Sequence, residues 1–283
     1  MNADGGHRAA GTVKASSATT LRPSLVKLGG SVITQKRGVP RLRPKVLRRL
    51  AEEITTADHP VIVLHGAGSF GHPAARRFGL HAAPTGPPAD PRRARGAAIV
   101  SAEVRRLHGA VLDALLGAGG RPWSVPPSAF ATQNRGGLES LDERPVRTAL
   151  SQGLTPLSFG DVVVDTSWGF SILSGDTLAI ELARRFVARR VLFVSDVEGV
   201  CDPSVEGRRS VLPVVTRDLV AALTERTRGP DVTGGIRGKV EAMLAIAENG
   251  CDAGLISGLT DGALSRALKG EPVYGSWSKA GSR

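Results

Sequence analysis

Residues 65–72 read HGAGSFGH, in which two histidines enclose glycines and other small residues directly after an apolar run. A flexible turn would account for these glycines. They would equally suit a backbone that must approach an anionic ligand closely, because a chain without side-chain volume can present its N–H groups to that ligand. In that interpretation three glycines and an alanine, Gly66, Ala67, Gly68 and Gly71, allow the close approach. His72 would donate a hydrogen bond at the ligand's edge, and the first histidine would be structural.

Two further segments combine a glycine pair with a lysine, KLGGS at residues 27–31 and TGGIRGK at residues 233–239. Paired glycines expose consecutive N–H groups, and the second pair opens a predicted helix whose dipole also favours an anion. A tight strand exit is the structural alternative. The chain has 7 lysines against 30 arginines, so a lysine beside a glycine turn is not ordinary surface charge here. The candidate anion-binding residues are Lys27, Gly29, Gly30, Lys36, Gly234, Gly235 and Lys239.

Carboxylates occur in three other segments, GD at 160–161 and SDVEGV at 195–200 after predicted strands, and SGD at 174–176 at the start of a predicted helix. An aspartate near phosphate-binding lysines would hold their ammonium groups in place, and one near a nucleotide could help to position a magnesium ion. Each segment alone is also a common turn. The candidate residues are Asp161, Gly175, Asp176, Ser195 and Asp196.

These segments together indicate phosphoryl transfer. That chemistry requires positioning and neutralisation of charge more than a protein nucleophile, which fits glycine loops flanked by lysines. The GxxxxGK[ST] loop of P-loop enzymes does not occur in the chain, and KLGGS at residues 27–31 is not a GxGxxG loop either, so this segment would bind phosphate in another way.

Short apolar runs alternate with helical periodicity along the chain. This alternation predicts an α/β fold, a three-layer αβα sandwich with a mostly parallel central sheet and ligands at the carboxyl ends of the strands. The predicted strands are residues 26–28, 61–64, 155–159, 162–164, 191–194 and 253–257, the third and fourth being either strands of a sheet or a hairpin. The predicted helices are residues 43–54, 94–116, 174–188, 216–223 and 234–249.

Composition limits the class of protein. With 283 residues, 41% of them hydrophobic, the chain can form a substantial core, and no apolar run reaches the roughly 20 residues that span a bilayer. Residues 1–20 lack the apolar segment of a signal peptide, so we expect a disordered leader followed by one domain at 21–283. Two cysteines, Cys201 and Cys251, fit a reducing cytoplasm.

The net charge of +11 raises the possibility of a nucleic-acid-binding protein. Aromatic residues make up only 4% of the chain, so few bases could be stacked, and the arginines are dispersed instead of forming one tract. A basic enzyme that acts on small polyanions fits equally well. We therefore expect small-molecule ligands, with no nucleic-acid and no membrane partner.

The motifs occur in a recognisable order: VKLGGS (26–31), HGAGSFGHP (65–73), GD (160–161), SGDTLA (174–179), SDVEGV (195–200) and DVTGGIRGK (231–239). In this order they resemble the amino acid kinase superfamily from about residue 21 onwards, and within it the isopentenyl phosphate kinases. The histidine of HGAGSFGHP at position 72 is the feature that points to that group, because it suits a phosphate acceptor instead of a carboxylate.

The resemblance implies ATP-dependent phosphorylation of isopentenyl phosphate to isopentenyl diphosphate, in isoprenoid precursor synthesis by an alternative mevalonate route. It implies that Lys27 bridges the transferring phosphoryl group, Lys239 and Lys36 approach the ATP phosphates, and Asp161 orients the lysines. The acceptor phosphate would lie against His72 and the residues Gly66, Ala67, Gly68, Gly175 and Asp176. ATP would contact Gly29, Gly30, Ser195, Asp196, Gly234 and Gly235.

The same resemblance implies ATP with Mg²⁺, a homodimer, and two halves, about 21–165 for the acceptor and about 166–283 for ATP. We also expect the helix at 94–116, with its small residues Ala97, Ala98 and Ser101, to form the wall of an apolar pocket for the five-carbon tail. Two alternatives stay open at this point. One is a related kinase acting on a small phosphonate, and the other is a nucleic-acid-binding or regulatory protein built on an inactive kinase scaffold.

Overall fold

The computed structural model describes residues 22–35, 39–86, 90–202, 210–220 and 235–281. Its central sheet has seven strands: β1 (Ser24–Leu28), β2 (Val61–His65), β3 (Pro122–Ser124), β6 (Thr155–Phe159), β9 (Arg190–Ser195), β10 (Asp252–Ser257) and β11 (Gly275–Ser278). Their order is β11-β10-β9-β1-β2-β6-β3, and every neighbouring pair is parallel except β10 with β11. The expected leader at 1–20 lies outside the described residues.

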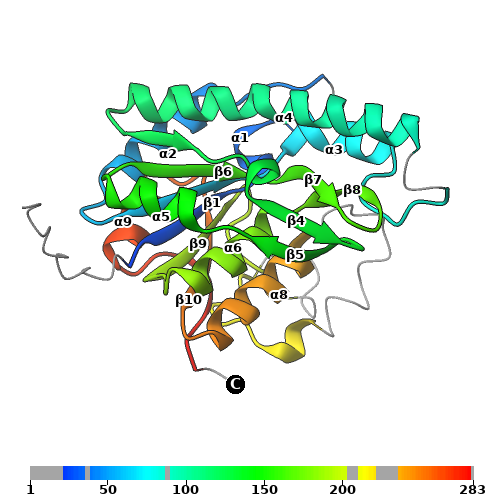
Figure 1. Cartoon of the computed structure of the whole chain (residues 1–283). Helices are drawn as coiled ribbons and strands as arrows, with labels where there is room; N and C mark the ends of the chain where they lie inside the picture. The colour runs from blue at the N-terminus through cyan, green and yellow to red at the C-terminus, as the bar shows by residue number, and fades with distance from the viewer. Residues whose placement is uncertain (1–21, 36–38, 87–89, 203–209, 221–234, 282–283) are drawn as a thin grey trace, which may run out of the picture.

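Helices cover both faces of this sheet (Figure 1). One face carries α1 (Gly30–Ile33), α2 (Pro44–Thr55), α4 (Pro91–Gly117) and α9 (Ala263–Lys269), and the other carries α5 (Arg144–Ser151), α6 (Gly175–Arg185) and α8 (Gly235–Glu248). Side chains along the buried strands alternate between these two cores, as Leu25 and Val26 do in β1. The predicted three-layer α/β sandwich with a mostly parallel sheet is therefore confirmed.

A second, four-stranded sheet was not predicted. It consists of β4 (Ala131–Asn134), β5 (Gly137–Leu141), β7 (Asp161–Asp165) and β8 (Gly169–Leu173), in the order β5-β4-β7-β8, and a short 3₁₀ helix (Pro127–Ala129) precedes it. The segments 155–159 and 162–164 are both strands but do not form a hairpin with each other. The first pairs with β2 and β3 in the central sheet, whereas the second pairs with β4 and β8.

The glycine-rich segments meet because their strands end at one level. Leu28, the last residue of β1, pairs with His65 of β2 and Val194 of β9, and His65 pairs with Phe159 of β6. The chain therefore leaves four neighbouring parallel strands at the same edge of the sheet, where α/β proteins form their ligand sites.

The HGAGSFGH stretch is only partly a loop. Helix α3 (Gly68–Arg77) begins within it, so His72 lies on a helix and not at the end of a turn. This helix packs against α4, and Gly71 lies in that contact. A Cβ atom at this position would lie 2.6 Å from the Cβ of Ala67 and 2.7 Å from a methyl carbon of Val104.

The predicted helices at 43–54 and 94–116 correspond to α2 and α4 within three residues at each end. Residues 217–220 are helical, and the remainder of the helix expected at 216–223 falls largely outside the described residues. None of the helices in the described ranges is long and apolar enough to cross a membrane.

The contact between α3 and α4 gives a matched test with two helical glycines. We expect Gly71→Ala to lower the free energy of unfolding by about 1–3 kcal/mol, because the new methyl group forces the helices apart. Gly109→Ala in α4, where a Cβ would meet nothing within 4 Å, should instead raise it by about 0.5–1 kcal/mol. Urea denaturation measures both values, and a Gly71→Ala protein as stable as Gly109→Ala would contradict the packing described.

Candidate active site

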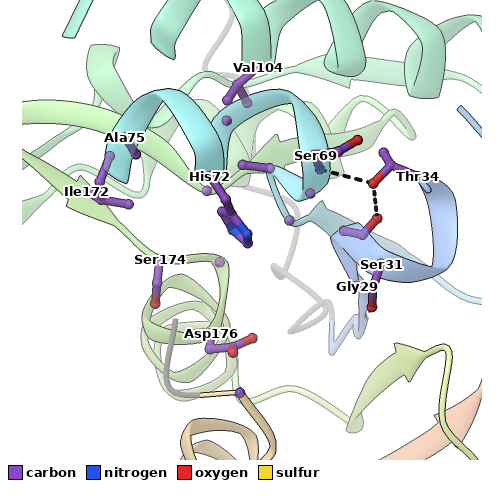
Figure 2. Close-up of a pocket in the computed structure, with 18 of the residues that line it drawn as sticks. Gly29, Ser31, Thr34, Ser69, His72, Ala75, Val104, Ile172, Ser174 and Asp176 are labelled. Atoms are coloured by element: carbon purple, nitrogen blue, oxygen red, sulfur yellow. Dashed lines mark hydrogen bonds between the residues drawn. The ribbon is translucent and has the colours of Figure 1, made fainter. Parts of the chain in front are cut away.

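A pocket of about 540 Å³ lies at the carboxyl ends of β1, β2, β6 and β9. Segments far apart in the sequence line it, from the loop after β1 to the first turns of α3, α6 and α8. Figure 2 shows the pocket with His72 pointing into it from α3 and Asp176 facing it from the start of α6. The sequence-predicted residues therefore converge on one cavity.

Two glycine loops cross in the floor of this pocket without room for side chains. A Cβ on Gly30 would lie 2.3 Å from the backbone nitrogen of Gly68, and one on Gly66 would lie 2.8 Å from the backbone nitrogen of Gly30. Gly68 also has a positive φ of 51°, a conformation that favours glycine. The Thr34 hydroxyl fastens the crossing, since it donates to the Gly30 carbonyl at 2.7 Å and accepts from the Ser69 N–H at 3.1 Å (Figure 2).

One carboxylate links two lysines from opposite ends of the chain. The Nζ atom of Lys27, in β1, lies 2.6 Å from Oδ1 of Asp176, and the Nζ atom of Lys239, in α8, lies 3.8 Å from Oδ2 of the same residue. All three side chains are at most 16% exposed. Two ammonium groups are thus held in one pocket wall, where they can bind a polyanion.

Local structure places Asp176 at this position. Ser174 caps α6, its hydroxyl accepting from the Thr177 N–H at 3.0 Å, so Asp176 falls in the first turn of the helix. The helix dipole favours a negative charge there. Burial disfavours the carboxylate, but Lys27 and Lys239 outweigh that effect, so the pKa of Asp176 lies below its ordinary value.

Asp161 does not have the role that the sequence suggested. It lines the pocket, but its ion pair is with Arg105 of α4 at 3.3 Å, and its Oδ1 accepts from the Val162 N–H at 2.8 Å. Burial raises the pKa of Asp161, although Arg105 opposes this. The expectation that Asp161 orients the lysines is wrong, because its side chain faces α4 and Asp176 makes both lysine contacts instead.

The pocket also has an apolar part. Val100 and Val104 of α4 line it, together with Ala75 of α3 and Ile172 of β8. In Figure 2 His72 lies between Asp176 and Val104, with Ala75 and Ile172 to one side of it. The helix at 94–116 does form this wall, as expected, but with its valines: of the small residues named for that role, Ala97 is packed in the core and Ala98 is exposed.

The loop after β9 closes another side of the pocket. Asp196 accepts a hydrogen bond from the Ser31 hydroxyl at 2.6 Å and one from Ser195 at 3.4 Å. This contact ties the end of β9 to the loop after β1, so the two segments approach the ligand space together. Gly29 joins them as well, its N–H donating to the Val194 carbonyl at 2.7 Å.

Most predicted site residues line the cavity: Lys27, Gly29, Gly30, Gly66, Ala67, Gly68, His72, Asp161, Gly175, Asp176, Ser195, Asp196, Gly235 and Lys239. Lys36 and Gly234 lie outside the described residues. Sequence reasoning missed Ser31, Thr34 and Arg105. Only Ser31 had a signal, its place directly after a glycine pair, whereas the other two depend on tertiary contacts.

Comparisons with known proteins agree on a family. The profile of the amino acid kinase family matches residues 23–257. The isopentenyl phosphate kinase of Methanothermobacter thermautotrophicus is 36% identical over 258 residues, 89% of this chain and 97% of that protein. The enzyme of the same name from Thermoplasma acidophilum is 34% identical over 220 residues, 78% of this chain and 85% of that protein. A crystal structure of an isopentenyl phosphate kinase superposes with a TM-score of 0.79 at 32% identity and covers 90% of this chain and 100% of that one.

The two pocket aspartates offer a direct comparison of their roles. We expect Asp176→Asn to lower the free energy of unfolding at pH 7 by about 3–5 kcal/mol, because the buried ammonium group of Lys27 and the partly buried one of Lys239 lose their counter-charge. Asp161→Asn should cost about 1 kcal/mol or less, since its partner Arg105 is 40% exposed. Denaturant titration of both variants measures the difference in stability. Equal losses of unfolding free energy would contradict the conclusion that Asp176, and not Asp161, holds the two lysines.

Proposed function

The chain belongs to the amino acid kinase family, and we propose that it transfers the γ-phosphate of ATP to isopentenyl phosphate, giving isopentenyl diphosphate and ADP. The relatives that carry the isopentenyl phosphate kinase name support this acceptor, since they are similar over most of both chains. A small-molecule phosphotransferase also fits a pocket built from glycine loops and lysines.

The observation that carries the proposal is the division of one pocket into a cationic part and an apolar part. Lys27 and Lys239 supply the positive charge, and Val104 and Ile172 belong to the apolar wall. Isopentenyl phosphate has the matching composition, a dianionic phosphate on a branched five-carbon chain. His72, between the two parts, would hold the acceptor phosphate (Figure 2).

The reaction follows from this arrangement. An oxygen of the acceptor phosphate attacks the γ-phosphorus of ATP, and the bond from that phosphorus to the β,γ-bridging oxygen breaks as ADP leaves. The attacking oxygen is already ionised near pH 7, because a phosphate monoester has a second pKa of about 6. The protein therefore needs no general base. It has to bring two anions together in line, which Lys27, Lys239 and backbone N–H groups favour by offsetting their repulsion.

We assign the individual roles as follows. Lys27 bridges the transferring phosphoryl group, Lys239 neutralises the β- and γ-phosphates, and Asp176 holds both ammonium groups. The acceptor phosphate contacts His72, Gly175 and the N–H groups of the HGAGSFGH loop. The remaining residues proposed to contact ATP are Gly29, Gly30, Lys36, Ser195, Asp196, Gly234 and Gly235.

We also propose that the reaction uses Mg²⁺. Among the described residues no group of three or more His, Cys, Asp or Glu side chains is arranged to hold a metal ion. This fits magnesium, which usually retains waters and binds through substrate phosphates plus one or two carboxylates instead of an all-protein cage. Asp196 is a carboxylate of the pocket that could contribute.

Three further assignments belong to the proposal. The half at about 21–165 binds the acceptor and the half at about 166–283 binds ATP, the enzyme acts in the cytoplasm, and two copies form a homodimer. Trp123 on edge strand β3 is 54% exposed and Leu116, near the end of α4, is 52% exposed. These large apolar side chains, in elements that pack together, support a contact between copies on the acceptor half.

An acceptor panel tests the proposed substrate. With ATP and magnesium, we expect kcat/KM for isopentenyl phosphate to exceed that for fosfomycin, acetylglutamate and UMP by at least about a hundredfold, because only this acceptor fills both parts of the pocket. Coupled detection of ADP measures each rate, and dimethylallyl phosphate reports tolerance of the tail. A higher kcat/KM for fosfomycin or UMP would overturn the assignment.

Alanine substitutions of His72 and of His81, as a control, test whether His72 binds the acceptor phosphate. His72→Ala should raise the KM for isopentenyl phosphate by about tenfold or more and leave the KM for ATP within about twofold, since a hydrogen bond to a charged group contributes about 1.5–3 kcal/mol. His81, which is exposed and does not line the pocket, should tolerate the same change. If the KM for isopentenyl phosphate were unchanged in His72→Ala, His72 would not be a residue that binds the acceptor.

A further inference from the structure

Two buried histidines form a hydrogen-bonded row behind the glycine loop. His65, at the end of β2, is fully buried, and its Nε2 lies 3.1 Å from Nδ1 of His108 in α4. His108 in turn places its Nε2 2.8 Å from the hydroxyl of Ser124, and His65 places its Nδ1 3.2 Å from the carbonyl oxygen of Gly66. The row therefore runs from edge strand β3 to the first residue of the glycine loop.

The Gly66 carbonyl sets the direction of every hydrogen bond in this row. A carbonyl oxygen can only accept, so Nδ1 of His65 must carry a proton. If His65 is neutral, its Nε2 is then an acceptor, and His108 has to donate to it from Nδ1. The Nε2 of His108 is left to accept from the Ser124 hydroxyl. All three contacts are satisfied by a single arrangement of protons.

The surroundings keep both rings neutral. Burial lowers the pKa of His65 to about 3, and the nearby His108 and Lys27 also disfavour its protonation. Burial and the guanidinium of Arg105 lower the pKa of His108 to about 4. Phe159 holds both rings in place, with its centroid 5.3 Å from that of His65 and 4.4 Å from that of His108.

The row ends on the peptide bond that faces the pocket. No cis peptide bond occurs in the described chain, so the Gly66 carbonyl and the Ala67 N–H point in opposite directions. A carbonyl fixed on His65 therefore turns the Ala67 N–H away from the histidines. Ala67 lines the pocket, and within the described residues its N–H donates to no protein acceptor.

We propose that the Ser124–His108–His65 row is a positioning device that fixes the orientation of the Gly66–Ala67 peptide, so that an N–H and not a carbonyl oxygen faces the acceptor phosphate. A flipped peptide would place an oxygen against an anion and repel it. His65 and His108 are thus positioning residues that act through the loop without touching substrate. Their kinetic role rests on the proposed function, whereas the proton arrangement does not.

Nuclear magnetic resonance tests the proton arrangement without any substrate. In protein labelled with ¹⁵N-histidine at pH 6, long-range ¹H–¹⁵N spectra should show His65 and His108 neutral, each with its proton on Nδ1. Spectra of His65→Asn and His108→Asn assign the two residues. A proton on Nε2 of either ring, or a charged ring, would overturn the row as described.

Kinetics test its purpose with two substitutions at one position. His108→Phe keeps a ring beside Phe159 but removes the donor to His65, and we expect the KM for isopentenyl phosphate to rise by about tenfold with the KM for ATP unchanged. His108→Asn can place an amide N–H near the position of Nδ1, so it should restore the acceptor KM to within about threefold of wild type. If both variants showed a similar rise in the acceptor KM, in proportion to their loss of thermal stability, His108 would have a purely structural role.

The two failures can be told apart. If wild-type protein does not phosphorylate isopentenyl phosphate while the resonance spectra show both Nδ1 protons, the proposed function fails and the row stands. If the wild type is active but His108→Phe and His108→Asn both keep wild-type acceptor kinetics, the positioning role fails and the proposed function stands.

Discussion

Two ammonium groups with little exposure to solvent repel each other across one pocket wall, and a carboxylate must lie between them to offset that repulsion; the site is organised around this constraint. Asp176 contacts both Lys27 and Lys239. For one carboxylate to reach both, β1 must point Lys27 toward the face that carries α6 and α8, and those two helices must pack side by side. The lysines then form a fixed positive surface before any phosphate arrives, which is the electrostatic preorganisation that phosphoryl transfer requires.

Positive charge alone would bind phosphates without aligning them, so the glycine loops supply the geometry. Gly30 and Gly68 meet backbone to backbone, which leaves room for ligand oxygens but not for side chains. Thr34 joins the two loops, and Ser31 joins the first of them to Asp196 after β9. The histidine row behind Gly66 extends the same logic, because neutral hydrogen bonds can orient a peptide without adding another charge to the site.

The sequence was most informative where the role of a residue depends on its immediate neighbours in the chain. Glycine pairs after apolar runs, and lysines in an arginine-rich chain, pointed to residues that the structure brings together around one pocket. The choice between Asp161 and Asp176 could not be made this way, because each directly follows a glycine, and only the packing of α4 and α6 decides which carboxylate meets the lysines. The second sheet was missed because strands such as ATQN and GLESL lack a clear alternation of apolar and polar residues. His72 was expected on a loop because glycines disfavour a helix. Helix α3 nevertheless forms there, and its packing against α4 stabilises it.

A pocket that works by alignment and charge neutralisation should contain no proton acceptor that limits the reaction. The pH dependence of the single-turnover transfer rate, with ATP and isopentenyl phosphate saturating, measures this most directly between about pH 5 and 8.5. We expect one rising limb with its midpoint at or below about pH 6, where the acceptor phosphate loses its second proton, followed by a plateau. The same limb should appear in wild type and in His72→Gln. A limb that disappears in His72→Gln would show that the protein supplies a base, and would contradict catalysis by charge neutralisation and alignment alone.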